Sequence, residues 1–211
     1  MHSDVLIVAR PERHPRIECA GGVAARCTEP DTVHLVSTAA TPLGGDAIAL
    51  RIIVEPGARL RVRSVAATVT LPGRTTAEST AHWHIEVAGD LDIDPEPTVV
   101  AGASRHSTST RMSVAATGRV RLRERVQIGR VDERQGFWSS SLHADVVGRP
   151  LLRHRIELGE DAFTHDLIAA PLASVSELRY PDVAADALGT VLPLAGGGSL
   201  ATWQGERLRA G

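Results

Sequence analysis

Short stretches in which apolar and polar residues alternate run along most of the chain. Residues 48–54 are apolar and rich in β-branched side chains, and in residues 59–64 arginines alternate with smaller, less polar side chains. A period of two places the arginines on one face of a strand and the other side chains on the opposite face. The sequence Glu-Pro-Gly-Ala at residues 55–58 separates the two stretches, and its proline and glycine predict a β-turn.

The same strand–turn–strand plan then recurs twice, around Gly89 and around Gly118. The turn glycines Gly57, Gly89 and Gly118 are roughly 30 residues apart, a spacing typical of stacked repeats. One hairpin cannot bury its apolar face alone, but stacked neighbours can. We therefore predict a mostly β fold of stacked β-hairpins, β-helix-like or solenoid-like, with the three glycines at equivalent corners. An ordinary β-sandwich of hairpins would show much the same pattern.

The pattern changes near residue 160. Residues 163–173 and 183–188 are rich in Ala and Leu and are predicted to form short helices, interrupted near Pro171 and Pro181. We expect a single domain over residues 1–211, with a β core at about 34–158 and an Ala/Leu-rich, partly helical tail at 160–211. Further strands of the core are predicted at 126–128, 142–147 and 151–158.

Composition narrows the class of protein. Aromatic residues make up only 3% of the 211 residues, so the core must be built from Val, Leu, Ile and Ala. All 23 basic residues are arginine, yet the net charge is −2, so no global basic field recruits nucleic acid or an anionic membrane. The apolar run Val5–Ala9 is too short for a signal-peptide core or a membrane span. Two cysteines, Cys19 and Cys27, form no disulfide framework and are expected to be buried or free thiols, so the expected compartment is the cytoplasm.

Two candidate metal-binding features stand out. Asp46 follows Gly44 and Gly45 directly before a strand, which predicts a turn in which the aspartate bonds its own backbone. The alternative is a carboxylate on a path for a divalent ion. His82 and His84 place two imidazoles on one strand face, which is a weak candidate for a metal pair. Nothing in the sequence supplies further ligands, and solvent-facing histidines remain the alternative.

No catalytic set emerges from the sequence. Residues 102–106, Gly-Ala-Ser-Arg-His, begin like a nucleophile elbow but lack its closing glycine and its strand-to-helix setting. The sequence contains no P-loop, no dinucleotide fingerprint and no zincin helix. This pattern favours a binding role without enzymatic activity.

Several segments, read together, resemble the UreD/UreH family of urease accessory proteins. Gly44-Gly45-Asp46, Pro56-Gly57-Ala58 and Ala67-Thr68 occur in the order that the family shows. Three later segments are also similar to the family: Pro95-Glu96-Pro97-Thr98, the stretch from Arg123-Glu124 to Ile128-Gly129-Arg130, and Gly148-Arg149-Pro150-Leu151-Leu152-Arg153. The matched stretch runs from about residue 34 to 158. The chain departs from the family in being shorter than a typical member and in an altered turn at Gln135-Gly136-Phe137-Trp138.

The resemblance implies a scaffold that helps to insert nickel into the urease apoprotein. It implies partners, namely the urease apoprotein, the helical accessory protein and the GTPase accessory protein, with nickel held transiently and no tightly bound cofactor. Two alternatives stay open. One is a β-solenoid enzyme acting on a polysaccharide, which would need clustered acidic or basic residues and an export signal. The other is a metal-free protein-interaction adaptor, which the sequence cannot separate from the scaffold.

Overall fold

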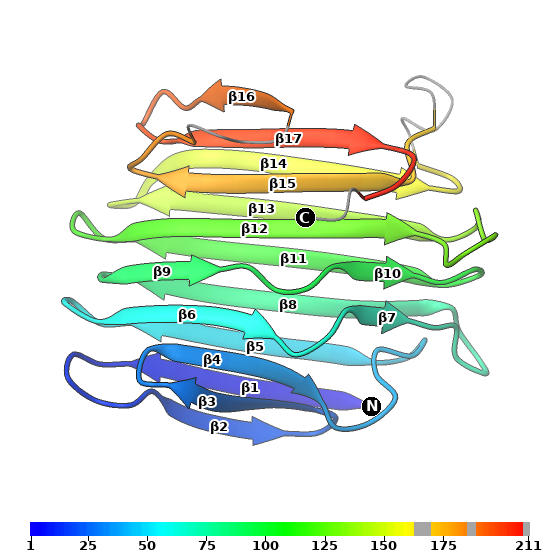
Figure 1. Ribbon diagram of the computed structural model, residues 1–211, viewed down its shortest axis with the longest axis horizontal. Coiled ribbons are helices and arrows are strands. Elements are labelled where there is room, and N and C mark those ends of the chain that lie inside the picture. Colours follow the sequence, from blue (N-terminus) through cyan, green and yellow to red (C-terminus); the bar gives the residue numbers. More distant parts are fainter. Residues whose placement is uncertain (163–169, 185–188, 209–211) are drawn as a thin grey trace.

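Two β-sheets packed face to face make up the described part of the protein (Figure 1). The computed structural model describes residues 1–162, 170–184 and 189–208. The seven-stranded sheet has the order β14 (Arg149–Gly159), β13 (Phe137–Val146), β11 (Arg105–Val114), β8 (Glu78–Val87), β5 (Ala47–Val54), β1 (His2–Ala9) and β2 (Arg16–Ala20). The ten-stranded sheet has the order β16 (Thr190–Pro193), β17 (Ser199–Gly205), β15 (Ala173–Tyr180), β12 (Arg119–Ile128), β9 (Asp90–Ile93), β6 (Arg59–Ser64), β4 (Thr32–Ser37) and β3 (Val23–Glu29), with β7 (Thr68–Thr70) and β10 (Thr98–Val100) paired beside β12.

The repeating units are arches rather than the predicted hairpins. In each unit the first strand lies in one sheet and the second in the other, as with β5 and β6, β8 and β9, and β11 and β12. Each strand instead pairs in parallel with the equivalent strand of the next unit. The stacking of repeats is therefore confirmed, while the pairing within a repeat was wrong. Alternation along one strand reveals which face is apolar but not which strand becomes its neighbour.

The three turn glycines lie at the same corner of successive layers, with an offset of one position. The strand register aligns Arg59, Asp90 and Arg119, so Gly89 and Gly118 stand level with Ala58. Gly57 lies one residue earlier and has a φ of +76°, which glycine adopts without strain. At Gly89 the reason for glycine is space, because an added Cβ would overlap the carbonyl oxygen of Ala58 in the layer below.

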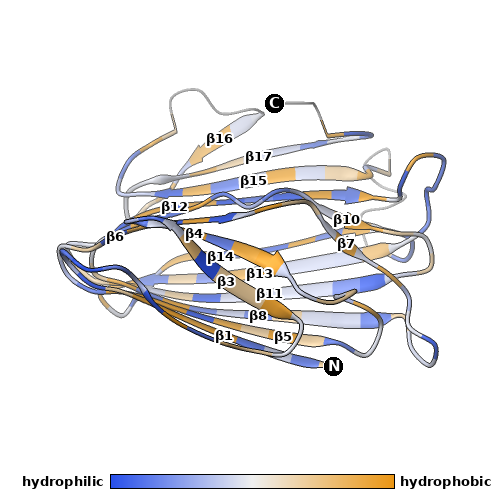
Figure 2. Cartoon of the chain, turned by 60° about the horizontal axis from the view of Figure 1, so that its bottom comes forward, coloured by the Kyte–Doolittle hydropathy of each residue, from blue (hydrophilic) through white to orange (hydrophobic). Residues whose placement is uncertain are grey.

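Apolar and polar positions succeed one another along the strands of both layers (Figure 2). The inward positions form two hydrophobic clusters built mainly from aliphatic side chains. Ile52, Leu60 and Ile85 are fully buried in the larger cluster, and Val126, Ile128 and Trp138 form much of the smaller one. The low aromatic content is thus compatible with a stable core, since each buried aliphatic side chain contributes about 1.5–3 kcal/mol.

A polar belt separates the two clusters. On β12, Glu124 lies between Leu122, which packs against the larger cluster, and Val126 of the smaller one. On β13, Ser140 lies in the same way between Leu142 and Trp138. Both polar residues occupy inward-facing positions of their strands, where an apolar side chain would be expected. One polar residue at an inward position of each strand therefore interrupts the apolar core.

The described part of the tail forms strands, and the short helices predicted for the tail are not seen among the described residues. Among the described residues, 170–184 and 189–208 contain no helix, and β15, β17 and β16 add three antiparallel strands to the stack. Residues 163–169 and 185–188, on which most of the predicted helices fall, lie outside the described residues. In β15, Ala173, Val175 and Leu178 are buried against the sheet, and β15 pairs with β12 along its whole length. Strands also precede the predicted core, with β1 beginning at His2. No described helix is long and apolar enough to span a bilayer.

Candidate functional site

A cavity of about 260 Å³ lies between the two sheets at the level of the polar belt. The seven-stranded sheet contributes polar side chains from β11, β13 and β14, and the ten-stranded sheet contributes polar side chains from β12 and β15. The polar residues that line its interior are His106, Thr108, Thr110, Glu124, Ser140, His154 and Ser176. Trp83, Leu142 and Leu178 supply apolar wall. The cavity is therefore an amphipathic chamber enclosed by strands that are far apart in the sequence.

Glu124 is the one carboxyl group enclosed within this chamber among the described residues. The residue is partly buried, and the surface that it keeps accessible faces the cavity. Burial raises the pKa of Glu124 to about 7, although the hydrogen bond that Ser140 donates to its Oε2 at 2.8 Å opposes the rise. Near neutral pH the group thus exchanges between a proton donor and an anion.

Two histidines supply neutral nitrogen atoms to the same chamber. Burial lowers the pKa of His106 to about 4, and its Nδ1 is hydrogen-bonded to the Ser79 hydroxyl at 2.9 Å. Burial also lowers the pKa of His154, whose Nε2 is buried and has no hydrogen-bond partner among the described residues. Both imidazoles stay neutral at pH 7, and a neutral imidazole can donate a lone pair to a metal ion.

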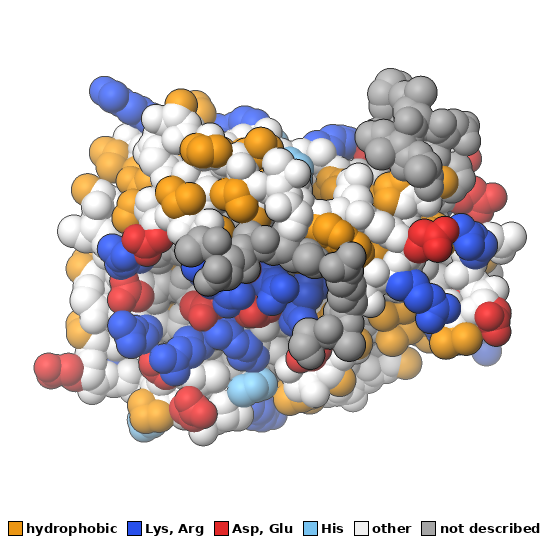
Figure 3. Space-filling view, turned by 45° about the horizontal axis from the view of Figure 1, so that its top comes forward, with side chains coloured by type: hydrophobic (Ala, Val, Ile, Leu, Met, Phe, Trp, Pro, Cys, Tyr) orange, Lys and Arg blue, Asp and Glu red, His pale blue; other side chains and the backbone are white. Residues whose placement is uncertain are grey.

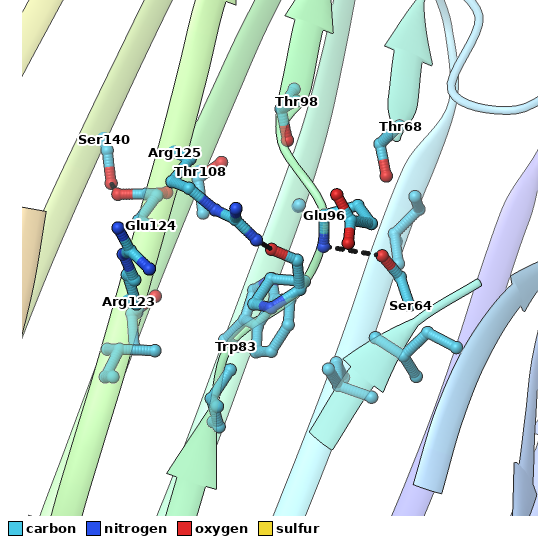
Figure 4. Close-up of a pocket in the computed structure, with 18 of the residues that line it drawn as sticks. Ser64, Thr68, Trp83, Glu96, Thr98, Thr108, Arg123, Glu124, Arg125 and Ser140 are labelled. Atoms are coloured by element: carbon cyan, nitrogen blue, oxygen red, sulfur yellow. Dashed lines mark hydrogen bonds between the residues drawn. The ribbon is translucent and has the colours of Figure 1, made fainter. Parts of the chain in front are cut away.

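The chamber reaches the surface where the ten-stranded sheet is interrupted. Residues 65–67 separate β6 from β7, and residues 94–97 separate β9 from β10. Val65 is 59% exposed and lines the same cavity as buried His106, so the cavity runs from the interior to the outer face. Figure 4 shows Ser64, Thr68, Glu96 and Thr98 around this opening, with Glu124 and Ser140 further along.

Hydrogen bonds fix the rim of this opening. The backbone N–H of Glu96 donates to the Ser64 hydroxyl at 2.9 Å, which ties the two interruptions together. Arg125 donates from Nη2 to the carbonyl oxygen of Pro95 at 2.6 Å. The guanidinium of Arg125 and the side chain of Glu96 therefore lie at the rim. The two hydrogen bonds fix the loops between the short strands.

Charged side chains cover the outer face of the ten-stranded sheet beside the opening (Figure 3). Acidic residues of β9 lie between arginines of β6 and β12, so the sign of the charge alternates from strand to strand. Arg121 lies 3.1 Å from Asp92, 3.0 Å from Asp94 and 3.1 Å from Glu177. Burial alone would lower the pKa of Arg121, but Glu177 and the two aspartates raise it above its ordinary value. This face stabilises itself by opposite charges in register.

Asp46 caps the turn that its glycines form. Its Oδ2 accepts hydrogen bonds from the Thr41 hydroxyl at 2.8 Å and from the backbone N–H of Leu43 at 2.9 Å. Its Oδ1 accepts from the amino group of Met1. Gly45 has a φ of +93°, and a Cβ on Gly44 would overlap the carbonyl oxygen of Thr76. The turn predicted for Gly44, Gly45 and Asp46 is present, and Thr41, which bonds to Asp46, lines the cavity.

His82 and His84 lie on the outer face of the seven-stranded sheet, away from the chamber. Both are exposed, while Ala81 and Ile85 beside them on β8 are buried. His82 Nδ1 is 2.8 Å from the Ser109 hydroxyl, and His84 Nε2 is 3.5 Å from a Glu86 carboxylate oxygen. Among the described residues, no three His, Cys, Asp or Glu side chains cluster closely enough to hold a metal ion.

The two cysteines and the serine of the elbow-like segment lie outside the polar interior of the chamber. Cys19 and Cys27 are free and exposed on β2 and β3. Ser104 of the elbow-like segment is buried and shares a hydrogen bond with the Thr70 hydroxyl at 2.9 Å, and the segment leads into β11 rather than a helix. Sequence reasoning missed Glu124, His106 and His154 as cavity residues. The signal that could have found Glu124 is a carboxyl group at an inward position between Leu122 and Val126.

The fold and the chamber define a stacked, parallel two-sheet β protein with a polar cavity through its core. The family model for the UreD urease accessory protein matches residues 23–192, so the chain belongs to the UreD urease accessory protein family. It is 42% identical over 190 residues to "Urease accessory protein UreD 1" of Saccharopolyspora erythraea, covering 86% of this chain and 74% of that protein. It is 47% identical over 150 residues to "Urease accessory protein UreD" of Frankia alni, covering 70% of this chain and 47% of that protein.

A third relative, "Urease accessory protein UreD" of Frankia casuarinae, is 39% identical over 178 residues, which cover 76% of this chain and 56% of that protein. The match to the two Frankia proteins thus spans only about half of their length. The segments that carried the sequence resemblance meet in space, since Thr68, Glu96 and Glu124 all line the cavity. The family resemblance and the cavity therefore point to the same part of the molecule.

Proposed function

We propose that this chain is a scaffold for urease maturation and that a nickel ion passes through the chamber on its way to the urease apoprotein. The observation that carries the proposal is the chamber itself, which joins buried nitrogen and oxygen donors to the surface. Membership of the UreD family supplies the link to urease. Under this proposal the chain has no catalytic activity of its own and works in the cytoplasm.

The donors of the chamber suit a passing divalent ion better than a resident one. Nickel accepts imidazole nitrogen and carboxylate oxygen. The chamber offers His106, His154 and Glu124, but no described cluster of three ligands holds an ion in place. A path must bind weakly enough to release its ion. Under the proposal the nickel is transient cargo, Asp46 and Thr41 mark one end of the path, and His82 and His84 offer at most a weak external contact.

The partners under this proposal are the urease apoprotein, the helical accessory protein and the GTPase accessory protein. Exposed apolar side chains support docking surfaces in two regions. Val65 and Val69 lie beside the opening, being 59% and 39% exposed, and Val183 and Leu192 lie in the tail, being 55% and 48% exposed. Scattered exposed apolar residues are common, but those at the opening would be covered if a partner received the ion there.

Glu124→Gln tests the proposal. The substitution keeps the size of the side chain and removes its negative charge, and Glu78→Gln on exposed β8 is the matched control. Both variants would be produced with urease and the other accessory proteins, and urease nickel content and assembly would be measured. We expect Glu124→Gln to assemble normally but to lower nickel content several-fold, with Glu78→Gln unchanged.

The alternative is a metal-free adaptor, and the lack of a three-ligand cluster in the described residues is the observation that favours it. An adaptor needs its surface and not the charge of Glu124. Unchanged nickel content in Glu124→Gln, with normal assembly, would therefore favour the adaptor. The family match gives no support to a polysaccharide-acting enzyme.

A further inference from the structure

Five basic side chains form one row across the outer face of the seven-stranded sheet. The strand register aligns Arg51 of β5, His84 of β8, Arg111 of β11, His143 of β13 and Arg153 of β14. All five are exposed, whereas Ile52, Ile85 and Met112 next to them along the strands are buried. The row therefore faces outward on five neighbouring strands that lie side by side in the rear layer of Figure 1.

The charges in this row are not balanced as they are on the other sheet. Glu86 contacts Arg51 at 2.8 Å and lies 3.5 Å from His84 Nε2, and Asp145 contacts Arg153 at 2.6 Å. Arg111, at the centre, has no ion-pair partner among the described residues, and its register neighbours on both sides are histidines. No ion pair within the described part of the sheet therefore accounts for the position of Arg111.

Short side chains leave the centre of the row open. Ser109 and Ser113 flank Arg111 along β11, and Ser141 precedes His143 on β13. The Ser109 hydroxyl is hydrogen-bonded to Nδ1 of His82 at 2.8 Å, and this bond keeps the imidazole close to the sheet. Small neighbours allow a guanidinium to reach a group lying flat on the face. The surface is thus shaped for an extended anionic partner rather than for a single ion.

The spacing of the side chains in this row favours one type of secondary structure in the partner. Neighbouring strands lie ~4.8 Å apart, so the row is roughly 19 Å long. An α-helix rises about 5.4 Å per turn, so acidic residues on successive turns nearly match this spacing. Same-face residues of an extended strand are about 6.8 Å apart and match it less well. A helix of roughly 13 residues would span the row.

We infer that this face docks an α-helix of a partner protein that carries a stripe of acidic residues and lies across the strands. Nucleic acid is the less suitable occupant, because the chain carries a net charge of −2 and the row is a single line of basic groups. The inference rests on the strand register and does not depend on the passage of nickel. It assigns a partner surface on the sheet opposite to the cavity opening.

A pair of helical peptides tests the inference. One peptide of about 18 residues carries four glutamates on successive turns of one face, and its isomer has the same composition with the glutamates spread around the helix. Binding to the full chain is measured by fluorescence anisotropy at low salt. Arg111→Glu is compared with Arg74→Glu, which makes the same change of charge at an exposed residue between β7 and β8.

We expect the striped peptide to bind about tenfold more tightly than its isomer, and Arg111→Glu to remove this preference while Arg74→Glu keeps it. Equal binding of the two peptides, or equal effects of the two variants, would overturn the inference. Tight binding of a single-stranded oligonucleotide that Arg111→Glu abolishes, without binding of the striped peptide, would assign the face to nucleic acid instead.

A stability measurement checks the premise independently. Arg111→Gln removes the central charge and keeps much of the side-chain stem. Because Arg111 has no ion-pair partner among the described residues, the melting temperature should stay within about 1 °C of that of the wild type. A fall in the melting temperature would show that Arg111 stabilises the sheet, and the row would then be a structural feature without a docking role.

Discussion

Ser140 and Glu124 meet across the chamber and join the two sheets. The hydroxyl of Ser140, on β13 of the seven-stranded sheet, donates a 2.8 Å hydrogen bond to the carboxyl group of Glu124, on β12 of the ten-stranded sheet. The contact lies between the two hydrophobic clusters. A polar link at this point interrupts the core, and it places a titratable group where the ionised form is costly.

The first prediction concerns the pH dependence that Glu124 creates. Its folded-state pKa of about 7 lies above its ordinary value of 4.5, so the folded protein binds the proton more tightly than the unfolded chain does. The contribution of Glu124 to stability is therefore full below pH 4.5 and is lost as pH rises through 7. Glu124→Gln removes this loss, so its free energy of unfolding relative to wild type should rise by about 3 kcal/mol between pH 4.5 and pH 8.

Urea unfolding of both proteins at several pH values measures this difference. The lowered pKa of His106 acts in the opposite direction, since it favours stability at higher pH, but it is common to both proteins and cancels. Glu78→Gln, at the exposed start of β8, is the control for replacing a glutamate by glutamine. A pH-independent difference for Glu124→Gln would mean that Glu124 is not held in a raised-pKa environment.

Local alternation made the strands predictable, whereas their pairing could not be derived from it. The arginines at 59–64 and the regular spacing of Gly57, Gly89 and Gly118 marked strands and corners correctly. Hairpins and arches share this local pattern, because both need a strand, a turn and a strand. The difference lies in which strands exchange hydrogen bonds, and this depends on contacts between residues that are about 30 positions apart in the sequence.

The chamber was hidden from the sequence for the same reason. His106 and Ser140 come from neighbouring strands of one sheet and Glu124 comes from the other sheet, so only the strand register and the packing of the two sheets bring them together. The helices predicted at 163–173 and 183–188 are not seen among the described residues, although most of these positions lie outside them. The strand β15, which follows the first of these ranges, pairs with the edge of β12, and such long-range pairing is not visible in local helix propensity.

The second prediction concerns the charged face of the ten-stranded sheet. Arg121 is about one-quarter exposed and contacts three carboxylates, whereas Arg59 is 60% exposed and, among the described residues, has an ion pair with Asp90 alone, at 3.5 Å. Arg121→Met should therefore lower the free energy of unfolding by about 2 kcal/mol, because it leaves half-buried carboxylates short of partners. Arg59→Met should change it by less than about 0.5 kcal/mol. Chemical denaturation measures both, and equal effects would contradict the difference in burial.

The third prediction concerns the corner at Gly89. A Cβ at this position would overlap the backbone carbonyl of Ala58, which cannot move without shifting the layer below. Gly89→Ala should lower the free energy of unfolding by about 2 kcal/mol. Gly102→Ala is the control, because the nearest atom to its added Cβ would be a side-chain atom of Glu133 at 3.5 Å. A thermal shift in Gly102→Ala as large as that in Gly89→Ala would show that the layers do not stack as tightly as described.

The fourth prediction separates the two roles considered for Asp46. Burial alone would raise the pKa of Asp46, but the hydrogen bonds from the Leu43 N–H, the Met1 amino group and Thr41 outweigh it and lower the pKa below 3.8. The contribution of Asp46 to stability is thus present above pH 3.8 and is lost as pH falls through the folded-state pKa. Asp46→Asn should cost about 1–2 kcal/mol at pH 7, and the cost should shrink in acid.

The turn role and the passage role of Asp46 then differ in cells. Thr41 both donates to Asp46 and lines the cavity, so a passing nickel ion would meet this end of the chamber close to the carboxylate. If Asp46 acts only in the turn, Asp46→Asn should leave urease nickel content unchanged once expression is matched. If the carboxylate also attracts the ion, nickel content should fall while the accessory complex still assembles. Thr41→Val is the control, since it weakens the same turn without removing a charge, and a fall of equal size in both variants would exclude a role for the charge.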